Sequence, residues 1–327
     1  MTLEQDTSEL PDARRFRQRL LVWFDQHKRD LPWRRDRDPY RVWLSEIMLQ
    51  QTRVAAVTDH YERFLRRFPS IEKLASAREA TVLAAWSGLG YYRRARMLHA
   101  AAKKVVKAHR GKLPGKAEDL LALPGIGRYT ASAIASIAFA EPVAVVDGNV
   151  ERVLQRVQGK TLAGENLWRA AEELLSRQRP GDFNQGMMEL GATVCLPRQP
   201  QCLLCPVSDL CATRGELHKP GKGTHQTKRE IHYALACRNG SIFLVQRPKT
   251  AALMPGMWEL PETGGANRTN ATWLTLRHSI TVTDYVVRVL RSPAPKGLEG
   301  RWVRKSRVAT LPLTGLARKI LRAAKII

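Results

Sequence analysis

Apolar residues recur at helical spacing along the chain up to about residue 194. Between residues 14 and 27, for example, Phe16, Leu20 and Phe24 fall on one face, with basic residues between them. A period of three to four residues predicts amphipathic helices. The expected helices span residues 14–27, 42–54, 57–67, 71–75, 79–85, 93–109, 120–123, 128–139, 148–158, 167–177 and 182–194.

The pattern changes beyond residue 230, where apolar and polar residues alternate. Alternation predicts strands at 232–237, 242–246 and 281–290, and helices are expected near Thr272 and over 314–324. Segment 213–230 combines proline, glycine and basic residues without an apolar period, so we expect a linker there. The predicted fold is multidomain, with an all-α region over 1–212 followed by an α+β domain over 231–327.

Within the helical region, Gly125 and Gly127 flank one apolar residue between two expected helices. Such glycines can simply form the tight corner of a helical hairpin. They can also let the backbone approach a phosphate, which the amides opening the second helix would bind. Asp147, which follows an extended run of valines and alanine, could either cap the helix beginning at Gly148 or face a substrate. The residues alone leave both choices open.

The charge of the chain points to a polyanionic partner. Lys and Arg total 54 against 30 Asp and Glu among 327 residues, which gives a net charge of +24. This excess favours nucleic acid as the partner. The longest uncharged run, 80–92, is too short to span a bilayer, so no membrane association is expected. No secretory signal is expected either, because the acidic N-terminal stretch lacks an apolar segment.

Glu46 is the charged exception in an apolar helix, with Val42 and Ile47 near it. A carboxyl group buried among such neighbours has a raised pKa, which a general acid working near neutral pH requires. Glu46 could instead lie on a solvated face and pair with Arg41 or Arg53.

A glycine-containing loop with two tyrosines, residues 87–92, precedes the basic helix 93–109. This loop could be only a helix connection whose tyrosine packs on the core. It is also compatible with a wedge inserted between bases, as in proteins that kink or unstack DNA. In that case we expect phosphate contacts from Arg93, Arg94, Arg96, Lys103, Lys104 and Lys107.

Four of the five cysteines, Cys195, Cys202, Cys205 and Cys211, follow a C-x6-C-x2-C-x5-C pattern. In a reducing compartment such clustering indicates a metal site rather than disulfides. Four thiolates can hold zinc or a 4Fe-4S cluster. Zinc sites usually contain two closely spaced cysteine pairs, whereas only one is present here. Cys237 stands apart and is expected to be a small core residue in a strand.

Residues 123–128, Leu-Pro-Gly-Ile-Gly-Arg, followed by the valine-rich run and Asp147, resemble the helix-hairpin-helix motif and catalytic aspartate of the endonuclease III superfamily of DNA glycosylases. The resemblance places the helix-hairpin-helix at about 113–139. In the lyase branch a lysine follows the motif, but this chain has Tyr129 there, as in the adenine DNA glycosylase (MutY) branch. The cysteine spacing resembles the cluster loop of the same superfamily, which implies a [4Fe-4S] cluster at 195–211.

The resemblance covers nearly the whole chain, most specifically 31–211, and implies roles for individual residues. Residues 31–33 (LPW) and 42–52 (VWLSEIMLQQT) are similar to the adenine glycosylase signature, which places Glu46 at the catalytic glutamate. The implied catalytic residues are Glu46, Tyr129, Asp147 and Asn149. The implied adenine pocket consists of Trp33, Arg34 and Gln185. The implied contacts to DNA or the lesion are Gln51, Thr52, Leu89, Tyr91, Gly125, Gly127 and Thr281.

Two of these residues also have simpler interpretations. Asn149 could serve only at the start of a helix, and Gln185 could be a core amide with satisfied hydrogen bonds. Arg198, inside the cysteine loop, is expected to contact phosphate.

Residues 244–248 (LVQRP) and 255–261 (PGMWELP) resemble the C-terminal domain of adenine glycosylases, which has the nudix hydrolase fold. A nudix hydrolase needs several glutamates after this strand to hold magnesium. Residues 262–273 (ETGGANRTNATW) lack that cluster, so no pyrophosphatase activity is expected. Many family members have Phe-Ser-His where this chain has Ile280, Thr281 and Val282, and of these Thr281 keeps a hydroxyl for contacting 8-oxoguanine.

Together these features predict a monofunctional adenine DNA glycosylase of base excision repair. Its expected partner is duplex DNA with 8-oxoguanine:adenine or guanine:adenine mispairs, bound by a monomer in the cytoplasm of a bacterium, at the nucleoid. The adenine would leave the base stack, Glu46 would protonate it at N7, and Asp147 would stabilise an oxocarbenium-like sugar.

Two alternatives follow from the same residues. A bifunctional glycosylase/lyase acting on oxidised pyrimidines would need an amine at position 129, which tyrosine cannot supply. A non-enzymatic sensor of damaged DNA would function unchanged after the substitution Glu46→Gln.

Overall fold

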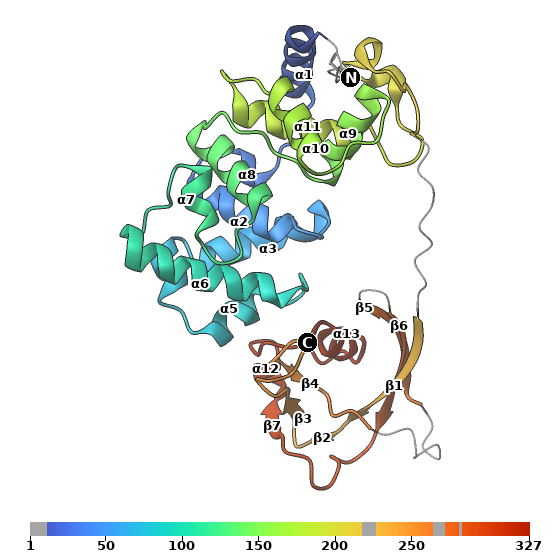
Figure 1. Cartoon of the computed structure of the whole chain (residues 1–327). Coiled ribbons are helices and arrows are strands. Elements are labelled where there is room, and N and C mark those ends of the chain that lie inside the picture. Colours follow the sequence, from blue (N-terminus) through green and yellow to red (C-terminus); the bar gives the residue numbers. More distant parts are fainter. Residues whose placement is uncertain (1–11, 218–226, 264–271, 281–282) are drawn as a thin grey trace, which may run out of the picture. The chain divides into compact units, whose positions relative to one another are not determined.

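The computed structural model describes residues 12–217, 227–263, 272–280 and 283–327 (Figure 1). Contacts between residues divide the chain into two compact units. The first unit contains residues 1–65, 70–72 and 100–220, and the second contains 66–69, 73–99 and 221–327. Part of the helical region, 73–99, therefore belongs to the same unit as the C-terminal strands.

The helices lie close to the positions that the apolar period predicts. They are α1 (Ala13–His27), α2 (Pro39–Leu49), α3 (Val54–Arg67), α4 (Ile71–Ala75), α5 (Glu79–Trp86), α6 (Tyr92–His109), α7 (Ala117–Leu121), α8 (Arg128–Phe139), α9 (Gly148–Gln158), α10 (Gly164–Leu174) and α11 (Pro180–Thr193), with 3-10 turns η1 (Pro32–Arg34), η2 (Cys202–Leu204) and η3 (Ser208–Leu210). In the described part of the chain, no helix is both long and apolar enough to cross a bilayer.

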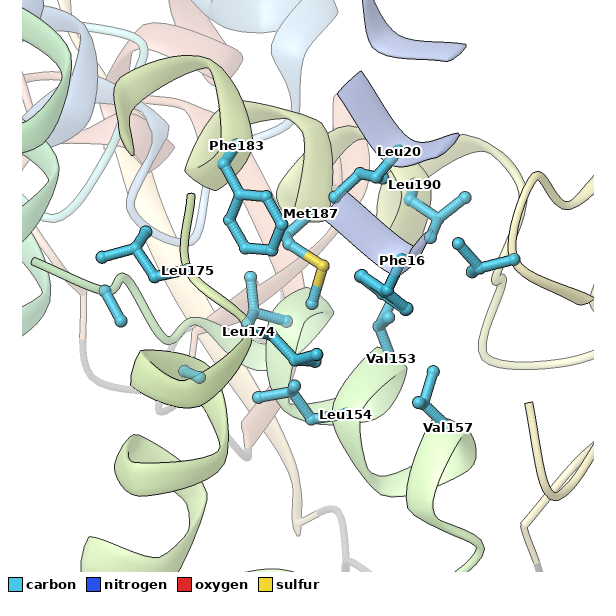
Figure 2. Packing of buried hydrophobic residues seen from close by; sticks show 14 of the residues in the cluster. Phe16, Leu20, Val153, Leu154, Val157, Leu174, Leu175, Phe183, Met187 and Leu190 are labelled. Carbon is cyan, nitrogen blue, oxygen red and sulfur yellow. The ribbon is translucent and has the colours of Figure 1, made fainter. Parts of the chain in front are cut away.

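The core of the first unit forms where α1, α9, α10 and α11 pack together. Asp12 caps α1 by accepting from the amides of Arg14 and Arg15, and the apolar stripe of α1 then faces inward. Figure 2 shows Phe16 near Met187 and Leu190 of α11 in this cluster of buried side chains. This packing holds the start of α9, where Asp147 lies, against α11.

Helix α8 packs against α2, α7 and α11. Its small side chains Ala131, Ala133 and Ala135 are fully buried, which lets the neighbouring helices approach closely. Helix α2 begins after its cap Asp38 and ends at Leu49, earlier than the expected residue 54. The backbone leaves the helical conformation at Gln50, whose ψ is 115°, and Gln51 then adopts a left-handed conformation with a φ of 53°.

The second unit contains two small sheets and the helices α12 (Lys305–Val308) and α13 (Gly315–Ala323). One sheet has the order β1-β6-β5, and the other joins β2, β3 and β4, with β7 also paired to β3. Strands β1 and β6 run parallel, whereas β5 and β6 are antiparallel. The strands are β1 (Thr227–Leu235), β2 (Cys237–Arg238), β3 (Ser241–Gln246), β4 (Trp258–Glu259), β5 (Leu274–Ile280), β6 (Thr283–Arg291) and β7 (Arg301–Arg304). An α+β C-terminal region is thereby confirmed.

Several expectations for this region were wrong. Residues after Thr272 form strand β5 instead of a helix, because Leu274 and Leu276 alternate with polar residues and pack on the sheet core. Strand β1 begins at Thr227, within the segment expected to be a linker, instead of at residue 232. The strand expected at 281–290 is confirmed as β6, which spans Thr283–Arg291 and pairs with β5. Cys237 lies in a strand but is exposed, because β2 is only two residues long.

Candidate active site

A buried carboxyl group lies among three helices of the first unit. Glu46 on α2 is 5% exposed, and the hydroxyl of Tyr129, in the first turn of α8, donates a hydrogen bond to its Oε2 at 2.7 Å. The same hydroxyl lies 3.6 Å from Sδ of Met188 on α11. Three helices that are distant in the sequence therefore converge on one carboxyl group.

The pKa of Glu46 is raised to about 7. Burial is the main cause; the hydrogen bond from Tyr129 opposes the rise, and the charge of Asp147 adds to it. Burial also raises the pKa of Tyr129 well above its usual value, with further contributions from Glu46 and Asp147. Near neutral pH, Glu46 is thus partly protonated and can give up a proton.

Asp147 caps α9, the first of the two roles that the sequence left open. Its Oδ1 accepts from the backbone amides of Asn149 and Val150 at 2.9 and 2.8 Å, and its Oδ2 accepts from Nδ2 of Asn149 at 3.0 Å. These three hydrogen bonds hold the side chain of Asp147 in place at the start of α9. Half-buried Asp147 is close enough to Glu46 for its charge to raise the pKa of Glu46, so two carboxyl groups share one site.

Asn149 has a partner beyond the helix start. Its Oδ1 accepts from the guanidinium of Arg152 at 2.8 Å, and Arg152 also donates to the carbonyl oxygens of Gly191 and Cys195 at 2.7 and 2.8 Å. Arg152 therefore connects the α9 start with α11 and the cysteine loop. No sequence pattern pointed to this role, since Arg152 is one arginine among many.

The three residues expected at the adenine pocket all belong to the first unit, and each contacts different neighbours. Trp33 is buried, and its ring meets Tyr61 edge-on with centroids 5.5 Å apart. Arg34 donates to Glu189 of α11 at 2.8 Å. Gln185 is half-buried on α11, one turn before Met188, so the two side chains share a face of that helix.

Glu189 is a site residue that the sequence reasoning missed. Its side chain is 1% exposed and also accepts from Arg29 at 2.7 Å. Burial alone would raise the pKa of Glu189, but hydrogen bonds from Arg29 and Arg34 outweigh it and lower this pKa to about 2. A carboxylate among apolar neighbours, the signal that marked Glu46, was available in FNQGMMEL to mark Glu189 as well.

The turn between α7 and α8 has two glycines with different roles. Gly125 has a φ of 75°, a conformation that suits glycine. Gly127 has an ordinary backbone conformation, and a Cβ atom placed on it would meet nothing within 4 Å. Because the fold itself leaves room for a side chain, the absence of one at Gly127 is compatible with close approach by an external partner.

The expected DNA-contacting residues divide between the two units. In the first, Gln51 is exposed and the Thr52 hydroxyl donates to the Gln50 carbonyl oxygen at 3.2 Å. In the second, Leu89 is buried, whereas Tyr91 is 51% exposed. Thr281 lies outside the described residues.

Several basic side chains of α6 that were expected to contact phosphate already contact other groups of the protein. Arg94 is half-buried, stacks over the rings of Trp86 and Tyr91, and has a pKa lowered by burial to about 10. Arg96 pairs with Glu79 at 3.0 Å, and Lys104 donates to the carbonyl of Ala122 at 2.7 Å.

The four clustered cysteines all line one small cavity of about 30 Å³. Arg156 is 4% exposed and donates to Sγ of Cys195 at 3.3 Å and to the carbonyl oxygens of Leu196 and Pro197. Burial and the neighbouring thiols raise the pKa of Cys205 to about 11. Four sulfur donors beside a buried guanidinium fit a negatively charged metal–thiolate group. Among the described residues, no three or more His, Cys, Asp or Glu side chains are arranged closely enough to hold a metal ion as they stand.

Comparisons with known proteins agree with this geometry. Residues 44–176 match the family described as HhH-GPD superfamily base excision DNA repair protein. The chain is 42% identical to the mouse adenine DNA glycosylase over 78% of this chain and 61% of that protein. It is 50% identical to the human adenine DNA glycosylase over 77% of this chain and 58% of that protein. The chain thus spans about three fifths of these relatives.

A solved structure of a thermostable thymine-DNA glycosylase resembles the fold as well. The TM-score is 0.59 at 32% sequence identity, and the alignment covers 62% of this chain and 96% of that one. The helical glycosylase fold expected from the sequence is thereby confirmed.

Proposed function

The chain belongs to the HhH-GPD superfamily of base excision DNA repair proteins, and on this basis we propose that it is an adenine DNA glycosylase. Its substrate would be duplex DNA in which adenine is mispaired with 8-oxoguanine or guanine, bound by a monomer. The observation that carries the proposal is the buried Glu46, with a pKa of about 7, close to the side chain of Asp147 that caps α9. Similarity to two mammalian adenine DNA glycosylases supports adenine as the base.

In the proposed reaction Glu46 acts as the general acid. Adenine rotates out of the duplex, because its glycosidic bond is inaccessible within the stack. Protonated Glu46 transfers its proton to N7 of adenine, which makes the base a neutral leaving group. The pKa of about 7 keeps this proton available near neutral pH.

Asp147 supplies the opposite charge. As the bond to adenine breaks, the sugar becomes oxocarbenium-like and the carboxylate stabilises it electrostatically. Two amides and Asn149 hold this carboxylate in place, so no reorganisation is needed when positive charge develops. A water molecule then adds to the sugar and completes hydrolysis.

The enzyme is proposed to be monofunctional. A lyase reaction needs an amine that attacks the sugar, and position 129 carries a tyrosine whose hydroxyl is engaged with Glu46. Borohydride would therefore trap no covalent complex between the enzyme and DNA.

We also propose that Cys195, Cys202, Cys205 and Cys211 hold a [4Fe-4S] cluster. Their common cavity and the guanidinium of Arg156 beside Cys195 support this assignment. When bound, such a cluster would tie the segment after α11 into one rigid loop.

The C-terminal region, 231–327, is proposed to be a nudix-like domain that recognises the lesion opposite adenine. The resemblance of its sequence to adenine glycosylases supports this role. Thr281, the residue expected to contact 8-oxoguanine, follows β5 and precedes β6 in the sequence and lies outside the described residues.

The test is single-turnover release of adenine from duplexes that carry it opposite 8-oxoguanine, guanine or thymine. A duplex with thymine opposite guanine serves as comparison, because one similar structure is of a thymine-DNA glycosylase. We expect adenine release to be fastest opposite 8-oxoguanine and to be abolished in Glu46→Gln. Glu173→Gln, the same change at an exposed position of α10, is the control. Release of thymine but not adenine, or full activity of Glu46→Gln, would refute the proposal.

A further inference from the structure

The loop that joins α5 and α6 in the second unit has buried ends and an exposed tip. We call residues 87–92 the glycine loop; its last residue, Tyr92, is also the first residue of α6. Ser87 and Tyr92, at its two ends, are 5% and 3% exposed, whereas Tyr91 is 51% exposed. The loop therefore presents one aromatic side chain to solvent while its ends are enclosed by protein.

Both ends of the glycine loop meet the same backbone carbonyl of the C-terminal segment. The hydroxyl of Tyr92 donates to the carbonyl oxygen of Leu313 at 2.8 Å, and the hydroxyl of Ser87 lies 3.3 Å from that oxygen. Arg318 of α13 donates to the Ser87 hydroxyl at 2.7 Å. The C-terminal segment thus contacts the loop through three hydrogen bonds, two at the Leu313 carbonyl and one from Arg318.

The accepting carbonyl is itself fixed. Leu313 is fully buried and forms a bridge to Trp258 of β4, and the amide of Thr314 donates to the Trp258 carbonyl at 2.9 Å. Pro255, shortly before β4, adds a contact, because its carbonyl accepts from the Arg96 guanidinium at 2.5 Å. The loop is therefore held by the carbonyl of a buried residue that is itself paired with strand β4.

Further hydrogen bonds hold the interior of the glycine loop. Trp86 Nε1 donates to the carbonyl of Gly90 at 3.1 Å, and Arg94 reaches the carbonyls of Leu89 and Gly90. Tyr91 has a φ of 46°, which is unfavourable for a residue with a side chain. Such a conformation persists only where its surroundings enforce it.

We propose that the Leu313 carbonyl positions the glycine loop so that Tyr91 can enter the base stack, with Tyr92 and Ser87 as positioning residues. The inference rests on the proposed function, since DNA is the partner. A wedge between bases has to resist their tendency to restack, and a loop held at both ends resists better than a flexible one. The C-terminal region would thus act on base extrusion by holding the loop as well as by reading the opposite base.

The test uses Tyr92→Phe, which removes the donating hydroxyl and keeps the ring. The readouts are single-turnover adenine release and the fluorescence of 2-aminopurine placed beside the adenine, which increases when the stack opens. We expect both the opening and the release rate to fall by about three- to tenfold, the range typical for one hydrogen bond. Ser87→Ala should act in the same direction. Tyr233→Phe, at a buried tyrosine of β1, is the matched control and should leave both readouts at their wild-type values.

A double-mutant cycle separates positioning from general destabilisation. If the Tyr92 hydroxyl acts through Tyr91, then Tyr92→Phe should have no further effect on stack opening in a Tyr91→Ala background. Wild-type opening and rate in both Tyr92→Phe and Ser87→Ala would overturn the inference, as would an undiminished effect in the Tyr91→Ala background. If wild type opens the stack but releases no adenine, the proposed function fails and the 2-aminopurine comparison still decides the positioning role.

Discussion

The hydroxyl of Tyr129 and the Oε2 atom of Glu46 lie 2.7 Å apart, although the two residues are 83 positions apart in the sequence. This hydrogen bond stabilises the ionised carboxylate and so limits how far burial raises the pKa of Glu46. The balance between the two effects places the pKa of a buried acid near neutral pH.

The rate of adenine release should therefore depend on pH through Glu46. The protonated acid is the active form, so the single-turnover rate should be highest below pH 7 and fall as the pH rises above about 7. In Tyr129→Phe the carboxylate loses its donor, its pKa rises further, and the fall should move to higher pH. A pH–rate profile that keeps its position in Tyr129→Phe would contradict the assignment of Glu46 as the acid.

The same pKa predicts a stability effect. Folding raises the pKa of Glu46 from 4.5 to about 7, so the free energy of unfolding decreases as the pH rises through that interval. Glu46→Gln, which stays neutral, should be more stable than wild type above pH 7 by at most about 3 kcal/mol. The gain should disappear toward pH 4.5 in urea unfolding. A difference between the two proteins that does not change with pH would rule out this explanation.

Replacement of Glu189 should lower the stability of the protein, whereas replacement of Glu46 should raise it. Glu189→Gln leaves Arg29 and Arg34 without their buried partner, so it should destabilise the protein by about 2–4 kcal/mol at pH 7, with allowance for the partial exposure of Arg29. The folded pKa of Glu189 is lowered to about 2, so its contribution is complete above pH 4.5 and is lost as the pH falls toward 2. Urea unfolding of Glu189→Gln against Glu173→Gln measures this, and equal stability of the two variants would contradict it.

The two glycines of the α7–α8 turn should respond differently to alanine. Gly127→Ala has room for its methyl group and should fold with the stability of wild type, yet bind duplex DNA about tenfold more weakly if a phosphate approaches there. Gly125→Ala has to adopt a φ of 75° and should lose about 1 kcal/mol of stability. Duplex affinity at one fixed salt concentration, together with thermal unfolding, distinguishes them. Unchanged affinity of Gly127→Ala would argue against a phosphate at this turn.

Arg156 should be required for retention of the proposed cluster. Arg156→Met removes the buried positive charge beside Cys195 and three hydrogen bonds within the loop, so the purified variant should contain at most about half the iron of wild type. Iron content and visible absorbance measure this directly. Arg169→Met, at an exposed position of α10, should keep the wild-type iron content. Equal iron in the two variants would show that the guanidinium is dispensable.

Parts of the fold and of the site could be predicted because they depend on residues that are close together in the sequence. The apolar period placed the helices, and the ends of α1, α8 and α9 lie at or within one residue of their expected positions. Asp147 at the start of α9 was a possible cap for the same local reason. The helix expected near Thr272 was wrong because a short window of apolar and polar residues fits either period, and pairing with β6 decides for the strand.

What the sequence by itself determined is the set of elements, the basic character of the chain and the chemical groups available at each position. The tertiary structure decided how those groups behave. Glu46 has a pKa near 7 only because the packing of α2 against α8 buries it and brings Tyr129 to it. The pKa of Glu189 on α11 is lowered because Arg29 and Arg34 donate hydrogen bonds to its carboxylate. The same fold brings Ser87 and Tyr92 to a carbonyl more than two hundred residues away, at Leu313. Burial and electrostatic interactions depend on distances in space, which no local pattern of residues contains.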